Sequence, residues 1–122
     1  PFISGINAGA HLVLVSHNVV TCMDAELPAS LSPKVHTILR DTMGFTGLIL
    51  TDDLAMKAID AYGEKAAPVG AALAGNDLMI TTDYAAAYHQ LLQAIEAGEL
   101  PVELVNRAAM RILAWKLKIG LL

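Results

Sequence analysis

The chain has 122 residues, the length of one domain, and 55% of them are hydrophobic while 16% are charged. A net charge of −4, with scattered lysines and arginines and few aromatic residues, excludes the basic, base-stacking surface of a nucleic-acid-binding protein. The single cysteine, Cys22, excludes an internal disulfide and is compatible with a reducing, cytoplasmic setting. No membrane-spanning run and no signal peptide is visible, so we expect one cytoplasmic segment over residues 1–122.

Three segments share one design, in which a glycine, an apolar run, a hydroxyl residue and an ionisable residue follow one another. They span residues 8–17, 47–52 and 74–83. Their starts lie roughly thirty to forty residues apart with helical patterns between them, which is the spacing of successive βα units. The sequence therefore predicts an α/β fold with three parallel strands.

Capping residues place the helices between and after these strands. Ser32 is a predicted N-cap, Pro33 the first helical residue and Gly44 the stop of the first helix. The stretch from residue 18 to residue 31 contains a proline and has no periodicity, so it is predicted to be a long loop at the end where the strands emerge. Further helices are expected over residues 64–73, 83–98 and 101–120.

Two adjacent carboxylates end the second apolar run. Leu48–Leu50 is too short for a helix and does not alternate, which indicates a strand covered on both faces. Asp52 follows at its carboxyl end, where α/β folds place their chemistry. We take Asp52 as the pocket-facing group and Asp53 as a neighbour that pairs with backbone or a cation. The alternative is that both residues only cap the turn that begins at Leu54.

Two other residues are candidates for the same site. His17 ends the first predicted strand, so it can bind or orient a group beside Asp52, or it can be a histidine that is hydrogen-bonded within its loop. Met56 can line the pocket, although a core methionine is the commoner case. No metal-binding motif and no phosphate-binding glycine loop occurs, so we expect no metal and no cofactor. The other histidines are expected to be structural, and they are His11, His36 and His89.

The residues around Asp52 resemble glycoside hydrolase family 3. The similarity lies in Phe2–Gly9, Val13–His17, Asp24, Pro28–Ser32, Leu39–Arg40, Gly44–Met56, Arg111–Leu113 and Lys116–Leu121. It covers nearly the whole chain and is specific around Asp52. The resemblance implies part of a (β/α)8 barrel, about three parallel βα units with a closing C-terminal helix.

The resemblance also implies a chemistry. The aspartate that matches Asp52 is the nucleophile of a retaining mechanism in that family, and members with Asp-Asp-Leu-x-Met at this point are typically β-N-acetylglucosaminidases. The substrate implied is therefore an N-acetylhexosaminide, with the residue that matches His17 near the sugar subsite. Retaining hydrolysis also needs an acid/base group, which this branch carries on a loop of the Lys-His-Phe-Pro-Gly-His-Gly type.

That loop does not occur in these residues, and the chain begins at Pro1 instead of methionine. We therefore expect a fragment that carries the nucleophile, is nearly inactive alone, and self-associates or pairs with the missing barrel half. Two other functions stay open from the residues. One is a phospho-acceptor α/β domain with an acceptor aspartate, and the other is a non-catalytic carbohydrate-binding or assembly fragment.

Overall fold

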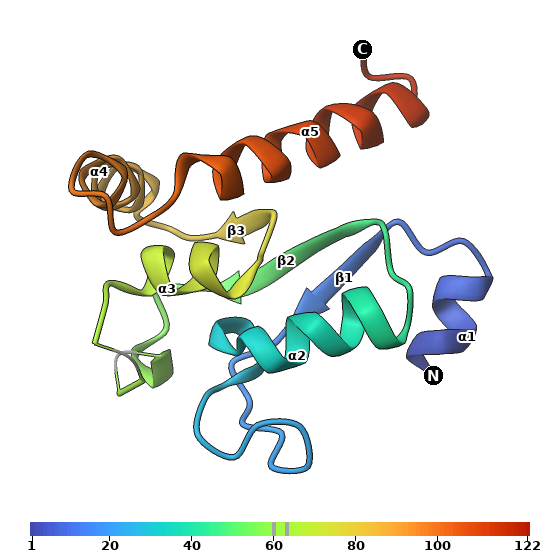
Figure 1. Cartoon of the computed structure of the whole chain (residues 1–122), viewed down its shortest axis with the longest axis horizontal. Helices are drawn as coiled ribbons and strands as arrows, with labels where there is room; N and C mark the ends of the chain where they lie inside the picture. The colour runs from blue at the N-terminus through green and yellow to red at the C-terminus, as the bar shows by residue number, and fades with distance from the viewer. Residues whose placement is uncertain (60, 63) are drawn as a thin grey trace.

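The computed structural model describes residues 1–59, 61–62 and 64–122 (Figure 1). Its elements alternate between helix and strand, as the sequence predicts. In chain order they are α1 (Phe2–Asn7), β1 (Leu12–Val15), the short 3-10 helix η1 (Ala29–Leu31), α2 (Pro33–Thr37), the π-helical turn η2 (Ile38–Thr42), β2 (Leu48–Asp53), the 3-10 helix η3 (Lys57–Ile59), α3 (Ala67–Ala74), β3 (Leu78–Ile80), α4 (Tyr84–Glu96) and α5 (Val102–Lys118).

The three strands form one parallel sheet in the order β1-β2-β3, which confirms the predicted parallel arrangement. Leu12 pairs with Leu48 and Val15 with Thr51, so β1 and β2 run in register. The register between β2 and β3 shifts between Leu50 and Asp53. Because β2 is the middle strand, it is hydrogen-bonded to a neighbouring strand on each side. The two carboxylates at its end therefore lie on the strand with the most hydrogen-bond partners in the sheet.

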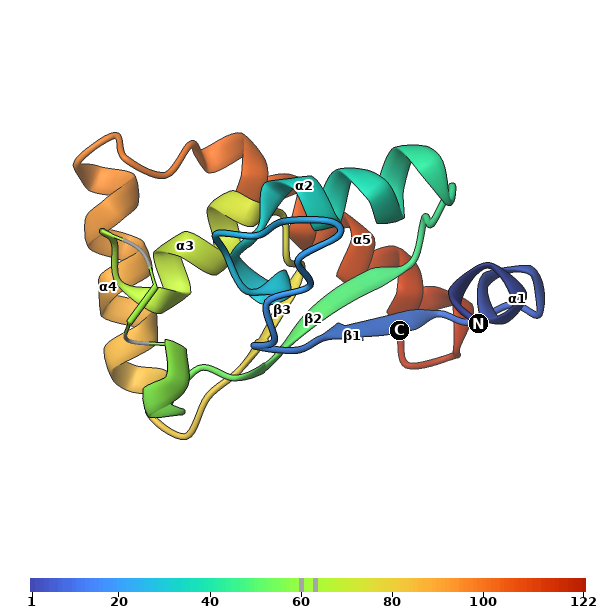
Figure 2. The same ribbon diagram turned by 90° about the horizontal axis from the view of Figure 1, so that it is seen from below.

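Helices cover one face of this sheet. The side chains of Val13, Val15 and Ile49 are buried against Val35 of α2 and Leu39 of η2. Figure 2 shows α2 and α3 lying along that face while α1 extends beyond the start of β1. No residue of α1 is buried, and its apolar surface is too small for it to be predicted from hydrophobic periodicity.

The opposite face of the sheet is largely uncovered. Leu12 and Leu14, which alternate with the buried Val13 and Val15 along β1, are exposed, and so is Ile80 on β3. Strands of an ordinary parallel sheet are covered on both faces, whereas this sheet has one apolar face open. The double coverage predicted for Leu48–Leu50 therefore holds for Leu48 and Ile49, which are both buried, whereas Leu50 is only half-buried.

Local chemistry explains why these elements begin and end where they do. Ser32 is the N-cap of α2, because its Oγ accepts the Val35 N–H at 3.2 Å. α3 ends at Gly75 in the left-handed region, with φ of +109°. At Gly47 a β-carbon would lie 2.4 Å from the carbonyl oxygen of His11, so only glycine fits where β2 begins. Among the described helices, none has the length and apolar character to cross a membrane.

Candidate active site

Asp52 stands at the carboxyl end of the central strand, as the sequence predicts. The preceding residue, Thr51, is fully buried, so alternation along β2 directs Asp52 toward the open face of the sheet. Asp52 is half-buried, and its Oδ1 accepts the N–H of Asp53 at 2.8 Å. The register shift between Leu50 and Asp53 places an irregularity at this point. Such bulges are common beside active sites, where they re-aim a side chain.

Asp53 has the supporting position expected of it. Its Oδ1 accepts the N–H of Ala55 at 2.9 Å, which forms a tight turn after β2. The capping alternative therefore describes Asp53. The backbone carbonyl of Asp53 meanwhile accepts a hydrogen bond from His17.

His17 lies against the end of β2, so the structure brings together two of the predicted site residues. Its Nε2 is 2.9 Å from the carbonyl oxygen of Asp53, and its Nδ1 is 2.7 Å from Oγ of Ser30. A carbonyl oxygen can only accept, so Nε2 carries a proton. In the neutral ring Nδ1 then accepts the Ser30 hydroxyl proton. Both ring nitrogens are thus satisfied, and the imidazole is fixed one residue away from Asp52.

Ser30 is the member of this arrangement that the sequence analysis missed. It is fully buried, and its N–H donates to the carbonyl of Ser16 at 3.0 Å. Its own carbonyl accepts the Asn76 side-chain amide at 2.8 Å. Hydrogen bonds therefore connect the start of β3, the long loop after β1 and the end of β2. The available signal was a hydroxyl two residues after Pro28, which does not identify a hydrogen-bond partner.

Asp24 orders the same long loop. Its Oδ2 accepts the Ser32 hydroxyl at 2.7 Å, and its Oδ1 accepts the N–H of Glu26 at 3.1 Å. These hydrogen bonds, that from Ser32 first, lower the pKa of Asp24 below its usual range. The carboxylate is thereby held ionised, and it ties the loop to the start of α2.

The third predicted site residue, Met56, lies on the turn after β2. Its N–H donates to the carbonyl of Asp53 at 3.1 Å, and its side chain is exposed. Met56 is therefore not the core methionine of the alternative interpretation. Within residues 1–59, 61–62 and 64–122, no three His, Cys, Asp or Glu side chains are grouped as metal ligands.

The geometry supplies a carboxylate on the central strand, a histidine bonded to the adjacent backbone, and an exposed apolar side chain on the following turn. A half-buried carboxylate of this kind can act as a nucleophile or a general base. Asp53 is not a second acid directed at the same point, because its carboxylate closes the turn with Ala55. The arrangement thus leaves Asp52 as the candidate for a reactive carboxylate.

Comparison with known proteins assigns the fold and its family. Residues 1–115 match the glycosyl hydrolase family 3 N-terminal domain. A β-hexosaminidase of Xanthomonas euvesicatoria is 35% identical over 116 residues, which are 90% of this chain and 34% of the relative. The β-hexosaminidase LpqI of Mycobacterium tuberculosis is 35% identical over 114 residues, 85% of this chain and 29% of the relative. The chain thus spans about a third of the length of these relatives.

Solved structures agree. A family 3 β-N-acetylglucosaminidase from a Paenibacillus species has a TM-score of 0.86 and 35% identity, covering 95% of this chain and 23% of that one. A β-N-acetylhexosaminidase from Beutenbergia cavernae has a TM-score of 0.81 and 29% identity, covering 94% of this chain and 36% of that one. The three parallel strands are accordingly part of a (β/α)8-type barrel. The chain belongs to glycoside hydrolase family 3, and it is a β-hexosaminidase-like domain of that family.

Proposed function

We propose that this chain carries the nucleophile of a retaining β-N-acetylhexosaminidase, and that the nucleophile is Asp52. The observation that carries the proposal is the half-buried Asp52 carboxylate at the carboxyl end of β2, on the open face of a family 3 sheet. Barrel enzymes collect their catalytic groups at this end of the strands. The β-hexosaminidase relatives favour an N-acetylhexosaminide as substrate.

In the proposed reaction an oxygen of Asp52 attacks the anomeric carbon of the sugar. The bond from that carbon to the leaving oxygen breaks, and an acid/base group outside residues 1–122 protonates the leaving oxygen. Water, deprotonated by the same group, then releases the sugar from Asp52. His17 keeps the strand end in place through the Asp53 carbonyl. Met56, exposed on the following turn, gives the sugar an apolar edge.

Residues 1–122 contain no Lys-His-Phe-Pro-Gly-His-Gly type segment. General acid/base catalysis contributes about 10²- to 10⁴-fold to rate. We therefore expect the chain alone to be slower than the enzyme that includes such a loop by at least this factor. Family membership favours this glycosidase function over a phospho-acceptor domain.

The assignment of Asp52 is tested by trapping the covalent intermediate. The enzyme that contains this chain is incubated with a fluorinated N-acetylhexosaminide whose glycosyl-enzyme intermediate turns over slowly, and the adduct is mapped by mass spectrometry. We expect the label on Asp52. Asp52→Asn should abolish labelling and reduce turnover by about 10³-fold or more, because a neutral amide is a poor nucleophile.

Asp53→Asn is the matched control. It removes one carboxylate from the adjacent position, while the amide oxygen can still accept the Ala55 N–H. This variant should keep the label and most of the activity. A label on any other residue would refute the assignment. Sugar binding without labelling or turnover would support a non-catalytic carbohydrate-binding role instead.

A further inference from the structure

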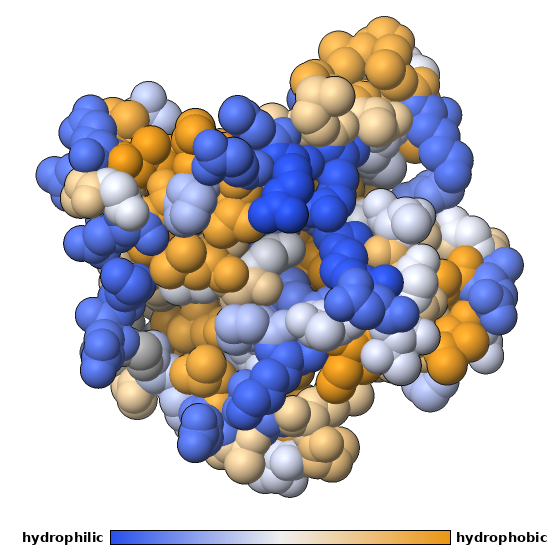
Figure 3. Space-filling model, viewed as in Figure 1, coloured by the Kyte–Doolittle hydropathy of each residue, from blue (hydrophilic) through white to orange (hydrophobic). Residues whose placement is uncertain are grey.

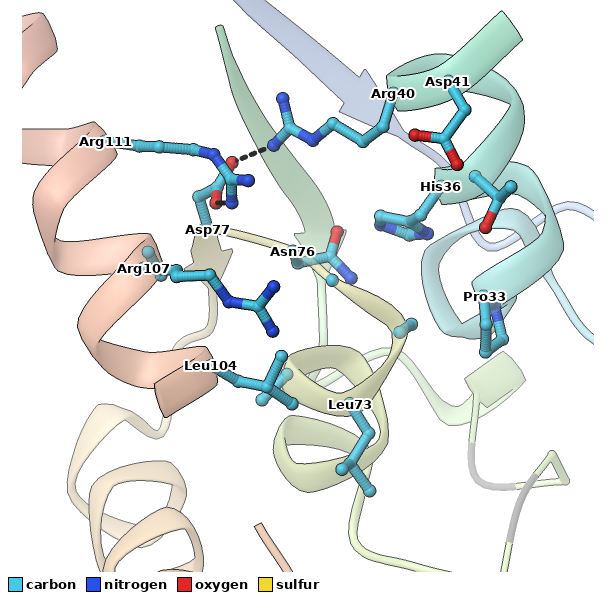
Figure 4. A pocket seen from close by; sticks show the side chains of 15 residues that line it. Pro33, His36, Arg40, Asp41, Leu73, Asn76, Asp77, Leu104, Arg107 and Arg111 are labelled. Atoms are coloured by element: carbon cyan, nitrogen blue, oxygen red, sulfur yellow. Dashed lines mark hydrogen bonds and ion pairs between the residues drawn. The ribbon is translucent and has the colours of Figure 1, made fainter. Parts of the chain in front are cut away.

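A pocket lies at the opposite end of the strands from Asp52. It has a volume of about 410 Å³, within the range of about 300 to 1,000 Å³ typical of small-molecule sites. Its walls come from α2 and η2, from the end of α3 with the loop to β3, and from the first half of α5 (Figure 4). Asp77, which precedes β3, marks this end of the sheet. We call this cavity the arginine pocket, because all three arginines of the chain line it: Arg40, Arg107 and Arg111.

Two of these arginines are held by one buried carboxylate. The Asp77 side chain is 1% exposed; its Oδ2 accepts from Arg40 at 2.5 Å and its Oδ1 from Arg111 at 2.9 Å. Oδ2 also accepts the Ile49 N–H at 2.9 Å. Arg40 is further occupied by the carbonyls of Phe45 and Gly47, so its role is structural. Asp77 is therefore fully engaged and cannot neutralise a further cation.

Positive charge remains on the α5 side of the pocket. Arg111 uses one nitrogen for Asp77, and its side chain is 38% exposed. Arg107 lies one helical turn earlier on α5, and no ion pair among the described residues involves it. Figure 4 shows Arg107 reaching from α5 toward the pocket centre, and Figure 3 shows a strongly hydrophilic patch between α5 and α2. Three guanidinium groups against the carboxylates of Asp41 and Asp77 leave one net positive charge.

The floor of the pocket has two buried polar atoms without a partner among the described residues, Nε2 of His36 and Oδ1 of Asn76. The Asn76 amide nitrogen donates to the carbonyls of Ser30 and Ala71, both at 2.8 Å. The amide oxygen is therefore the atom that lacks a hydrogen-bond partner. Nδ1 of His36 donates to the carbonyl of Ser32 at 2.8 Å. The floor thus has an amide oxygen and an imidazole nitrogen side by side.

Both floor atoms are acceptors. Burial, the largest influence, outweighs the contacts with Ser32 and Asn76 and lowers the pKa of His36 below its usual value, so the ring is neutral at pH 7 and Nε2 has a lone pair. Two buried acceptors without a donor cost free energy, and they are common where a ligand or a water supplies the missing proton. Two hydroxyl groups of a ligand, one for each acceptor, would satisfy this floor.

The geometry points to a binding site for a small hydroxylated oxyanion in the arginine pocket. We propose that a phosphate or carboxylate group pairs with Arg107 and the free nitrogens of Arg111, while two hydroxyl groups of the same ligand donate, one to His36 and one to Asn76. Arginine binds both kinds of oxyanion with paired, charge-assisted hydrogen bonds. The proposal does not depend on the function of Asp52, since the two sites lie at opposite ends of the sheet.

The test is a titration of the 122-residue chain, followed by NMR signals of the arginine Nε–H groups and of the His36 ring. The probes are glycerol 3-phosphate, methyl phosphate and lactate. Glycerol 3-phosphate should shift the signals of Arg107, Arg111 and His36, with a Kd about tenfold lower than that of methyl phosphate, which lacks the hydroxyls. Lactate binding as tightly as glycerol 3-phosphate would identify the oxyanion as a carboxylate. Equal affinity for the two phosphates would overturn the proposal.

Arg107→Gln is the informative variant. Arg107 is exposed, so the substitution should leave the fold intact, and the NMR spectrum of the variant chain checks this. The substitution should weaken glycerol 3-phosphate binding about tenfold. Lys116→Gln removes one positive charge from the same helix outside the pocket and should change the Kd by less than about twofold. Equal weakening by the two variants, or no shift at Arg107 with any probe, would overturn the site.

Discussion

The hydroxyl of Ser30 fixes the side chain that stands beside Asp52. Ser30 is fully buried, and its Oγ is 2.7 Å from Nδ1 of His17, whose other nitrogen bonds the carbonyl of Asp53. A neutral histidine with both nitrogens occupied has one orientation and one tautomer. At the scale of single residues, the orientation of His17 thus depends on a serine that has no part in the proposed reaction.

Ser30→Ala is expected to lower the free energy of unfolding by about 1–3 kcal/mol, because Nδ1 of His17 loses its buried partner. Urea denaturation measures the change. Ser4→Ala is the control, since Ser4 is exposed on α1, and it should stay within about 0.5 kcal/mol of the original chain. If the two variants unfold at the same urea concentration, the hydrogen bond to His17 does not stabilise the fold.

At the scale of elements, one carboxylate, that of Asp24, ties the long segment between β1 and α2 to the start of α2. Asp24 accepts hydrogen bonds from Ser32 and from Glu26, and these bonds lower its pKa in the folded chain. The unfolded chain has the ordinary aspartate pKa of about 3.9. Between the lowered value and about 3.9 the unfolded state binds more protons, so stability rises with pH in that window. The contribution is complete above about pH 3.9 and is lost as pH falls through the lowered pKa.

Asp24→Asn should therefore flatten the dependence of unfolding free energy on pH below about pH 4, and it should lower stability at neutral pH. Urea midpoints measured from roughly pH 2 to pH 6 test this. Asp41→Asn is the matched control, because Asp41 is exposed and accepts no hydrogen bond from the described residues. Parallel pH curves for Asp24→Asn and the original chain would contradict the role given to Asp24.

At the scale of the whole molecule, an apolar sheet face lies open. Leu14, in the middle of this face on β1, is 48% exposed, and β1 is an edge strand of the described sheet. Exposed apolar faces and free strand edges both favour association with another chain.

We expect the 122-residue chain to scatter light as a species heavier than one chain at micromolar concentration. Leu14→Lys should shift the mass toward that of a monomer, because a charge on the open face disfavours its burial. Leu117→Lys, on α5 and 62% exposed, should have a smaller effect. A monodisperse monomer of the unchanged chain would disprove the self-association.

The sequence predicts features that rest on local chemistry. The Ser32 cap and the three parallel strands follow from short sequence patterns, and the structure confirms them. Contacts between distant segments cannot be predicted this way. The Ser30 to His17 bond spans 13 positions and the Arg40 to Asp77 pair spans 37, so neither leaves a periodic trace in the chain.

In the candidate site, too, the features that depend on adjacent residues can be predicted from the sequence, and those that depend on distant contacts cannot. The position of Asp52 at a strand end follows from a three-residue apolar run and two carboxylates. The orientation of His17 requires knowing that Ser30 and the Asp53 carbonyl reach it from two other segments. The arginine pocket likewise could not be predicted from the sequence, because its floor and its walls come from α2, α5 and the segment before β3.

Because β2 is the middle strand of the sheet and β1 an edge strand, we expect β2 to open less often than β1. Amide protons of β2 are bonded on both sides of the strand, so they are expected to exchange with water only in the rarest and most global openings. β1 has a partner on one side, and the segment after it carries His17. Local opening of β1 would release the histidine while Asp52 keeps its place. The proposed nucleophile thus lies on the strand that we expect to open most rarely, whereas His17 lies on a segment that we expect to open more often.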